Sequence, residues 1–373
     1  MRAGQCDGGL NSGARGGGFD DRTGPDRAAG QIREYLTVGA RPGSASREDE
    51  TPAVAHAVLL QAVPALPLQR VQAAIAARRH FLGRQTKSQI AEDLSLSRFK
   101  VARLIEAAIE EGIVNFVISE PADLDVDLSD KVRKRYGLKS VLVLKGPDQP
   151  TSALTEPLGS LAAQLLEEMF ADGQLLGVAW GRTLAAAARA LTRLPRVDVV
   201  QVAGNPTGLD FALNPVEIVH RIARAGSGRP YPIYAPMWVE DQAAVEGLRG
   251  ERSVAEALAL YPRIDVLAVG IGSWHPPESC LCAAFPSTWH DQALGAGVRA
   301  DLCATLIDDE GKAVASPLDQ LGLGITAEQL RRIPEVVGIG GGLEKAAAIA
   351  SVLRGGWITT LVTDGGVARR LLA

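Results

Sequence analysis

From about Pro121 to the C-terminus, this 373-residue chain alternates short apolar runs with stretches of helical periodicity. Seven runs have the length and composition of buried strands: SVLVL (140–144), LLGVA (175–179), VDVVQV (197–202), YPIYAP (231–236), IDVLAVGIG (264–272), VVGIG (336–340) and WITTLV (357–362). The clearest helical pattern between them covers 158–170. Such alternation favours a parallel, helix-covered sheet with right-handed crossovers. We therefore predict an α/β domain over residues 121–373.

A smaller unit is predicted over residues 67–120, where three helical patterns follow one another. The first covers 69–81 and has three residues at helical spacing, Val71, Ala74 and Ile75. The second begins at Thr86, which forms a capping box with Gln89. Its expected buried residues are Ile90, Ala91 and Leu94.

The third helix of this unit follows the turn Ser95-Leu96-Ser97 and runs to about Glu111, with Ser97 as its N-cap. Its apolar residues form one stripe: Val101, Leu104, Ile105 and Ala108. Gly112 ends it, and IVNFVI (113–118) predicts a short strand. Three helices followed by a strand, with a short turn between the second and third helices, are the order of a winged helix-turn-helix.

Positive charge is concentrated in this unit. The whole chain has a formal net charge of −4, whereas residues 67–118 contain eight Lys and Arg against five Asp and Glu. A basic helix can enter the major groove of DNA, and a helix N-terminus can bind a phosphate. The predicted DNA-binding residues are Thr86, Lys87, Ser97, Arg98, Lys100 and Arg103. The alternative is a helical bundle whose basic side faces only solvent.

The first 66 residues differ from both units. Eleven of the 40 glycines fall within residues 1–50, which have almost no apolar periodicity. Such a segment cannot bury enough surface to offset the entropy of ordering it, so we expect it to be disordered. An over-extended translation start is the other reading of this segment. Residues 51–66 are richer in Ala, Val and Leu and predict a short helix or a packed connection.

Two loops of the α/β domain are suited to binding an anion. In GVAWGRTL, Gly181, Arg182 and Thr183 lie between a predicted strand and a helix start. Glycine lets the backbone approach a ligand closely, while Thr and Arg supply hydrogen-bond donors. In GIGGGLEK, the consecutive glycines Gly340, Gly341 and Gly342 precede Lys345, which lies in the first turn of the next helix. Glycines in such turns also serve packing alone, but the two loops together favour a phosphorylated ligand. Neither matches a dinucleotide fingerprint or a Walker A motif.

Other polar residues carry weaker signals. Gly270, Gly272 and Ser273 follow a predicted strand and are expected to line the same pocket. Asp364 is expected to be the N-cap of the last helix. One group of Cys and His residues lacks the usual spacing of a zinc site, so a Pro- and Trp-rich lid is the favoured interpretation: His275, Cys280, Cys282 and His290. We expect no metal and no cofactor.

The sequence has no pattern typical of a membrane span, a signal peptide or a disulfide framework. No apolar run approaches the roughly 18 to 20 residues of a membrane span, and the N-terminus lacks the apolar core of a signal peptide. Four cysteines are too few and too unevenly placed for a disulfide framework. We therefore expect a cytoplasmic protein with reduced thiols and no membrane partner.

Six segments, taken in order, resemble those of the SorC/DeoR-type sugar-binding transcriptional regulators: KSQIAEDLSLSRFKVARLIEAAIEEGIV, GVAWGRTL, NPVEIVHRIA, VLAVGIGS, GLEKAAAI and TTLVTDGGVARRLL. The resemblance covers about Gln69 to Ala373. It implies a winged helix-turn-helix before a phosphosugar-binding domain with the fold of pentose-phosphate isomerases and aminosugar-phosphate deaminases. It also implies a phosphorylated sugar or polyol as effector.

Carried over residue by residue, the resemblance implies that Gly181, Arg182, Thr183 and Lys345 hold the phosphate. Two further residues, Asn214 and Ser273, would contact the sugar. In GVRADLC the chain has Ala300 where relatives usually carry Gly before the Asp, so the shape of this loop is expected to differ.

The leading hypothesis is a transcription factor that binds a palindromic DNA operator as a homodimer or homotetramer under the control of this effector. The effector would shift the population between two assemblies. The main alternative is a phosphosugar isomerase or deaminase, for which Asp265 and Asp364 are the candidate general bases. No acid–base pair stands out, and the added helix-turn-helix favours regulation. A module that has lost catalysis is a third reading, which explains neither the phosphate loops nor the basic helix.

Overall fold

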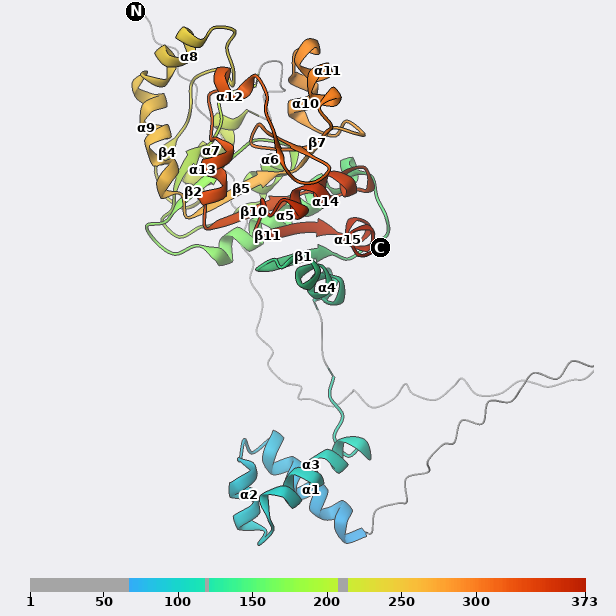
Figure 1. Cartoon of the computed structure of the whole chain (residues 1–373). Helices are drawn as coiled ribbons and strands as arrows, with labels where there is room; N and C mark the ends of the chain where they lie inside the picture. Colours follow the sequence, from blue (N-terminus) through green and yellow to red (C-terminus); the bar gives the residue numbers. More distant parts are fainter. Residues whose placement is uncertain (1–66, 118–120, 207–213) are drawn as a thin grey trace, which may run out of the picture. The chain divides into compact units, whose positions relative to one another are not determined.

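The computed structural model describes residues 67–117, 121–206 and 214–373, so the predictions for residues 1–66 lie outside the described residues. The chain divides into two compact units, with the division between Val114 and Asn115. Figure 1 shows the helical unit and the α/β unit. Each has a hydrophobic core of its own.

The first unit is built from three helices, α1 (Pro67–Phe81), α2 (Lys87–Asp93) and α3 (Arg98–Glu110). Both predicted N-caps are confirmed. The Thr86 side chain accepts a hydrogen bond from the Gln89 N–H within a capping box, and the Ser97 side chain accepts one from the Lys100 N–H. Alanines supply much of the core, which consists of Ala73, Ala76, Ala77, Ile90, Ala91, Val101, Leu104, Ile105 and Ala108.

One prediction for this unit is wrong, and the residues at helical spacing in α1 are not those that face its core. The face of α1 that carries Val71 and Ile75 is exposed, and α1 packs on α3 through its alanines. Small side chains allow a shorter distance between two helix axes. The strand expected over 113–118 is not formed in its described part, residues 113–117. Ile113 and Val114 pack against the helical core instead, and the described residues of this unit offer no second strand for pairing.

The second unit is organised around a seven-stranded sheet with the strand order β1-β11-β10-β5-β2-β3-β4. Every pairing in this sheet is parallel, which confirms the predicted α/β class. The strands are β1 (Ser140–Leu144), β2 (Leu175–Val178), β3 (Asp198–Gln201), β4 (Pro230–Tyr231), β5 (Val266–Gly270), β10 (Glu335–Ile339) and β11 (Thr360–Asp364).

The winding direction of this sheet reverses between β2 and β5. From β2 the chain moves outward through β3 to β4, whereas from β5, on the other side of β2, it moves through β10 to β11. Right-handed crossovers place the helices of the two directions on opposite faces. In open α/β sheets, ligands bind at such a reversal, beyond the carboxyl ends of the strands.

Helices cover both faces of the sheet. Helix α6 packs against both α5 and α7, and these three helices form one layer. Helices α14 and α15 also pack against each other. The helices of this unit are α4 (Val126–Tyr136), α5 (Thr151–Met169), α6 (Arg182–Ala190), α7 (Pro215–Ala225), α8 (Gln242–Arg249), α9 (Arg252–Leu260), α10 (Cys280–Ala284), α11 (Ser287–Gly295), α12 (Leu318–Leu321), α13 (Ala327–Arg332), α14 (Ala346–Arg354) and α15 (Gly365–Leu372). Two short 3-10 helices, η2 (Tyr261–Arg263) and η3 (Leu343–Lys345), complete the set described.

A small antiparallel sheet lies beside the main one in the chain order β6-β7-β8-β9. Its strands are β6 (Gly272–Ser273), β7 (Val298–Leu302), β8 (Thr305–Asp308) and β9 (Ala313–Val314). Gly272, expected at the end of a long parallel strand, therefore belongs to this second sheet. A Cβ atom on Gly272 would lie 2.1 Å from an Asp301 carboxylate oxygen, so only glycine permits this close approach of β6 and β7.

Three further element boundaries differ from the prediction for local reasons. Only Tyr231 of the run 231–236 lies in a strand, because Pro232 and Pro236 have no N–H and the Ile233 N–H donates to the Gln201 side chain. The last strand begins at Thr360, since Trp357 is buried in the preceding turn, where its indole N–H donates to the Gly311 carbonyl. The helix expected over 158–170 is α5, which begins at Thr151.

The contact between α5 and α6 generates the first testable prediction. A Cβ atom on Gly159 of α5 would lie 2.5 Å from the Ala186 Cβ of α6, whereas one on Gly247 of α8 would meet no atom within 4 Å. Gly159→Ala should therefore lower the free energy of unfolding by about 1–3 kcal/mol despite its better helix propensity. The matched change Gly247→Ala should raise it by up to about 1 kcal/mol. Denaturant titration of both variants measures this, and equal effects would contradict the packing described.

Candidate functional site

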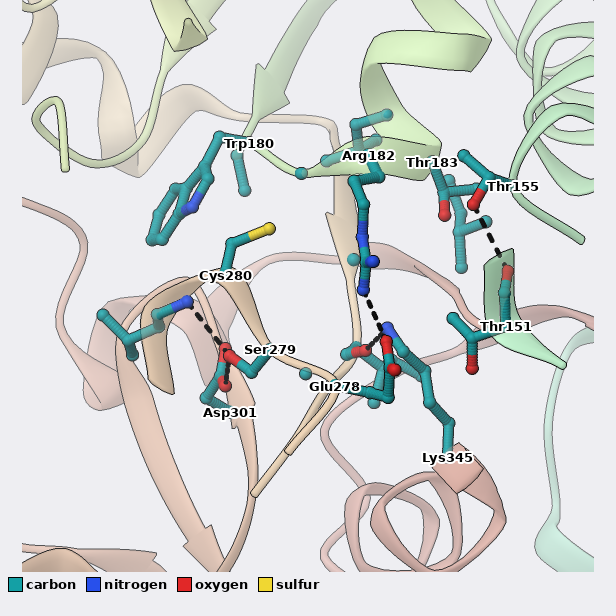
Figure 2. Close-up of a pocket in the computed structure, with 18 of the residues that line it drawn as sticks. Thr151, Thr155, Trp180, Arg182, Thr183, Glu278, Ser279, Cys280, Asp301 and Lys345 are labelled. Atoms are coloured by element: carbon teal, nitrogen blue, oxygen red, sulfur yellow. Dashed lines mark hydrogen bonds and ion pairs between the residues drawn. The ribbon is translucent and has the colours of Figure 1, made fainter. Parts of the chain in front are cut away.

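A cavity of about 570 Å³, including its mouth, lies at the reversal of the sheet. Its walls include residues that follow the carboxyl ends of β2 and β5, the last residue of β10, and residues of β7. Figure 2 shows Arg182 and Lys345 entering it from opposite sides.

The loop after β2 supplies one side of the cavity. Gly181 is the N-cap of α6 and has a φ of 135°, a conformation that favours glycine. Because Gly181 has no side chain, the first turn of α6 presents its backbone N–H groups to the cavity, which Cys280 also lines. The Arg182 guanidinium donates to the Glu278 carboxylate at 2.6 Å. Thr183 lines the cavity beside them.

Lys345 supplies a buried positive charge opposite this loop. It is the last residue of η3 and the N-cap of α14, and only 9% of its surface is exposed. Its ammonium donates to the Ile271 carbonyl at 2.6 Å. Burial lowers the pKa of Lys345 below its usual value, while the Asp301 carboxylate acts in the opposite direction. No carboxylate of the described residues lies within 4.0 Å of this ammonium.

Asp301 connects the cavity to the segment that carries α10. One oxygen of its carboxylate accepts hydrogen bonds from the Trp274 indole N–H at 2.8 Å and from the Ser279 hydroxyl at 2.5 Å. The Ser279 oxygen in turn accepts from the N–H groups of Leu281 and Cys282 at the start of α10. Burial raises the pKa of Asp301. Asp301 thereby positions the segment from which Glu278 and Cys280 reach the cavity (Figure 2).

Sequence reasoning missed several polar residues of this cavity, among them Thr151, Glu278, Cys280 as a lining residue, and Asp301. Thr151 is the first residue of α5, and its N–H and hydroxyl both donate to the Glu344 carboxylate. The signal for it was the apolar periodicity, which continues upstream of Leu158 to Leu154. Glu278 and Asp301 carry no local signal, because each is brought to the cavity by the small sheet and the loop before α10.

Six of the eight predicted effector-binding residues line the cavity: Gly181, Arg182, Thr183, Gly270, Gly272 and Lys345. Ser273 is fully buried beside it, and its hydroxyl donates to the Glu344 carbonyl. Asn214 is the N-cap of α7, where its side chain accepts from the Val216 N–H, and it is not among the lining residues. Its position follows residues 207–213, which lie outside the described residues.

The two candidate general bases have structural roles. Asp265 accepts a hydrogen bond from the Leu175 N–H at the amino end of β2, away from the carboxyl edge of the sheet. Asp364 caps α15, as predicted, and also accepts from the Gly342 N–H. Neither lines the cavity. Within the described residues, no group of three or more His, Cys, Asp or Glu side chains could hold a metal ion, and no helix is long and apolar enough to cross a membrane.

The candidate DNA-binding surface lies on α3 and on the caps of α2 and α3. Arg98, Lys100 and Arg103 are exposed, and none has a carboxylate within 4.0 Å in the described part of the chain. Two other arginines of the unit are paired, Arg70 with Glu111 and Arg79 with Asp93. The charges of α3 are therefore available to an anionic partner.

Comparison with known proteins gives the family. Residues 120–373 match the sugar-binding domain family, Sugar-bind, over more than half of the chain. The chain belongs to the SorC/DeoR-type sugar-binding transcriptional regulators. The deoxyribonucleoside regulator of Bacillus subtilis (strain 168) is 24% identical to this regulator over 300 residues, covering 80% of this chain and 96% of the relative. The sorbitol operon regulator of Klebsiella pneumoniae is 25% identical over 292 residues, covering 77% and 93%.

Solved structures show the same fold. The full-length sorbitol operon regulator SorC from Klebsiella pneumoniae has a TM-score of 0.63 to this regulator, with 23% identity, and covers 82% of this chain and 99% of its own. A DeoR family transcriptional regulator from Listeria monocytogenes has a TM-score of 0.60, with 24% identity, over 66% of this chain and 99% of its own. The relatives are named as regulators, and this protein is a regulator of carbohydrate metabolism rather than an enzyme. Membership implies a DNA operator and a sugar effector as partners.

The hydrogen bonds of Asp301 lead to the second prediction. Asp301→Ala leaves the Trp274 indole N–H and the Ser279 hydroxyl without their acceptor in a buried place, which should cost about 2–5 kcal/mol of unfolding free energy. Asp301→Asn keeps an oxygen acceptor of similar size and should cost much less. Chemical denaturation compares the two variants, and equal losses would show that the hydrogen bonds do not position this segment.

Proposed function

We propose that the cavity binds the phosphate of a phosphorylated sugar or polyol and that this binding controls operator affinity. The observation that carries the proposal is the buried Lys345 ammonium, whose direct hydrogen-bond partner among the described residues is a carbonyl oxygen alone. A buried charge is costly unless an opposite charge compensates it. A phosphate dianion would provide this compensation.

Two features on the opposite side of the cavity support a phosphate rather than a neutral sugar. The N-terminus of α6 directs N–H groups and the positive end of its dipole into the cavity. Arg182 adds a guanidinium, which can bind phosphate through two parallel hydrogen bonds. A phosphate here would compete with Glu278 for the Arg182 side chain. Effector binding would thus act on the segment that precedes α10.

We propose further that residues 67–120 bind operator DNA through α3 and that residues 121–373 bind the effector and form a homodimer or homotetramer. The unpaired cations of α3 support the first assignment. A palindromic operator would match the symmetry of such an oligomer. The effector would shift the population between two arrangements that differ in operator affinity.

For the DNA-binding surface, we expect Arg103→Ala and Arg98→Ala to weaken binding of a duplex selected by the full chain from a random pool. The loss should be about 1–3 kcal/mol for a residue that contacts a base, and smaller for a phosphate contact. Lys312→Ala removes the same charge from an exposed site on the α/β unit and serves as the control. Anisotropy titration at fixed salt measures the affinities, and unchanged values for both arginine variants would rule out α3 as the recognition helix.

For the effector, Lys345→Met should abolish most of the thermal stabilisation produced by phosphorylated sugars or polyols. A ligand at 100 times its Kd stabilises wild type by about 2.7 kcal/mol. Without ligand, Lys345→Met should be as stable as wild type or more so, since it removes a buried charge. Lys312→Met is the matched control. Thermal-shift assays with each sugar and its phosphate measure the difference, and equal stabilisation of Lys345→Met and wild type would place the phosphate elsewhere.

A further inference from the structure

Phe99 is the most exposed large apolar residue of the described part of α3. It is the second residue of the helix, between Arg98 and Lys100, and 84% of its surface is accessible. The core of the unit is complete without it, because the apolar stripe of α3 lies on the opposite side of the helix. An aromatic ring in this position does not contribute to the stability of the unit, and its exposure to water is unfavourable.

The helical geometry places Phe99 with the cations of α3. Residues three, four and seven positions apart share one face of a helix, so Phe99 lies on the same face as Arg103 and Glu106. Phe99, Lys100, Arg103 and the N-cap Ser97 also line one groove of the unit. The apolar ring therefore belongs to the surface that presents unpaired positive charge, at the N-terminal end of α3.

The chemistry of the major groove restricts what such a ring can read. Donors and acceptors of the base edges need polar side chains, whereas the C5 methyl group of thymine is the apolar feature of that groove in unmodified DNA. In helix-turn-helix proteins, the N-terminal residues of the recognition helix contact the base edges. A phenylalanine that cannot hydrogen-bond can discriminate there only by apolar contact.

We propose that Phe99 reads the C5 methyl group of one thymine in each operator half-site. This inference rests on the proposed DNA-binding role of α3 and names the chemical group that the helix selects. Arg98, Lys100 and Arg103 supply affinity for the polyanion, and Phe99 supplies sequence preference at a single base pair.

The test uses the full chain and a duplex that it selects from a random pool. Each thymine of the selected duplex is replaced in turn by deoxyuridine, which lacks only the C5 methyl group. For wild type, one such replacement per half-site should weaken binding about fourfold, the value for losing one buried methyl group. Phe99→Ala should bind the thymine duplex several-fold more weakly than wild type does. This variant should bind the thymine and deoxyuridine duplexes with equal affinity. Phe99→Leu should retain part of the thymine preference.

Ile109→Ala is the matched control, because Ile109 is an exposed apolar residue of the same helix, about 15 Å along its axis from Phe99. It should keep the wild-type preference for thymine. A wild-type protein that tolerates every deoxyuridine replacement would overturn the inference while leaving DNA binding intact. Equal losses of affinity by Phe99→Ala for thymine and deoxyuridine duplexes would also overturn it, in favour of a ring that wedges between base pairs. Failure to enrich any duplex would instead contradict the DNA-binding proposal itself.

Discussion

The reversal of winding direction between β2 and β5 determines where this regulator can bind a small molecule. Two neighbouring parallel strands continue into connections that run in opposite directions, so their loops diverge and leave space at the carboxyl edge. The loop after β2 leads to the N-terminus of α6, and the loop after β10 leads to Lys345. The glycines in these loops let backbone and side-chain donors approach the same volume. The arrangement follows from the topology of the sheet and does not depend on which sugar is bound.

Neither positive group in this cavity is fully compensated by a rigidly held carboxylate. Arg182 is paired with Glu278, which lies on a loop rather than on the sheet. Burial lowers the pKa of Lys345 and the Asp301 carboxylate opposes this shift, but the hydrogen-bond partner of the Lys345 ammonium within the described residues is a carbonyl oxygen. Asp301 itself is held by Trp274 and Ser279. An anion that replaces Glu278 at Arg182 would alter the contacts of the loop before α10. The conformation of this loop would therefore differ between the ligand-free and ligand-bound states.

The helical unit depends on a small core and on side-chain helix caps. Its core is small and rich in alanine, so three short helices pack closely. Side-chain caps at Thr86 and Ser97 begin the second and third helices and support the turn between them. Among the residues that the structure describes, the cations of α3 have no carboxylate partner, and the same helix exposes Phe99. Exposure to water is unfavourable for the Phe99 ring, whereas the exposed Arg and Lys side chains are well hydrated. A surface that is anionic and carries an apolar group would suit both.

Sequence alone determined the α/β class, the order of three helices in the first unit, both N-caps and six residues of the cavity. These features depend on neighbours within one element or on the residues after one strand. The first helix shows the limit: Val71 and Ile75 have helical spacing, yet the alanine face packs inward. Tertiary structure alone brought Thr151, Glu278 and Asp301 to Lys345, from elements far apart in the chain. Periodicity records which residues share a face, whereas the partner of that face and the burial of each charge depend on contacts between distant segments.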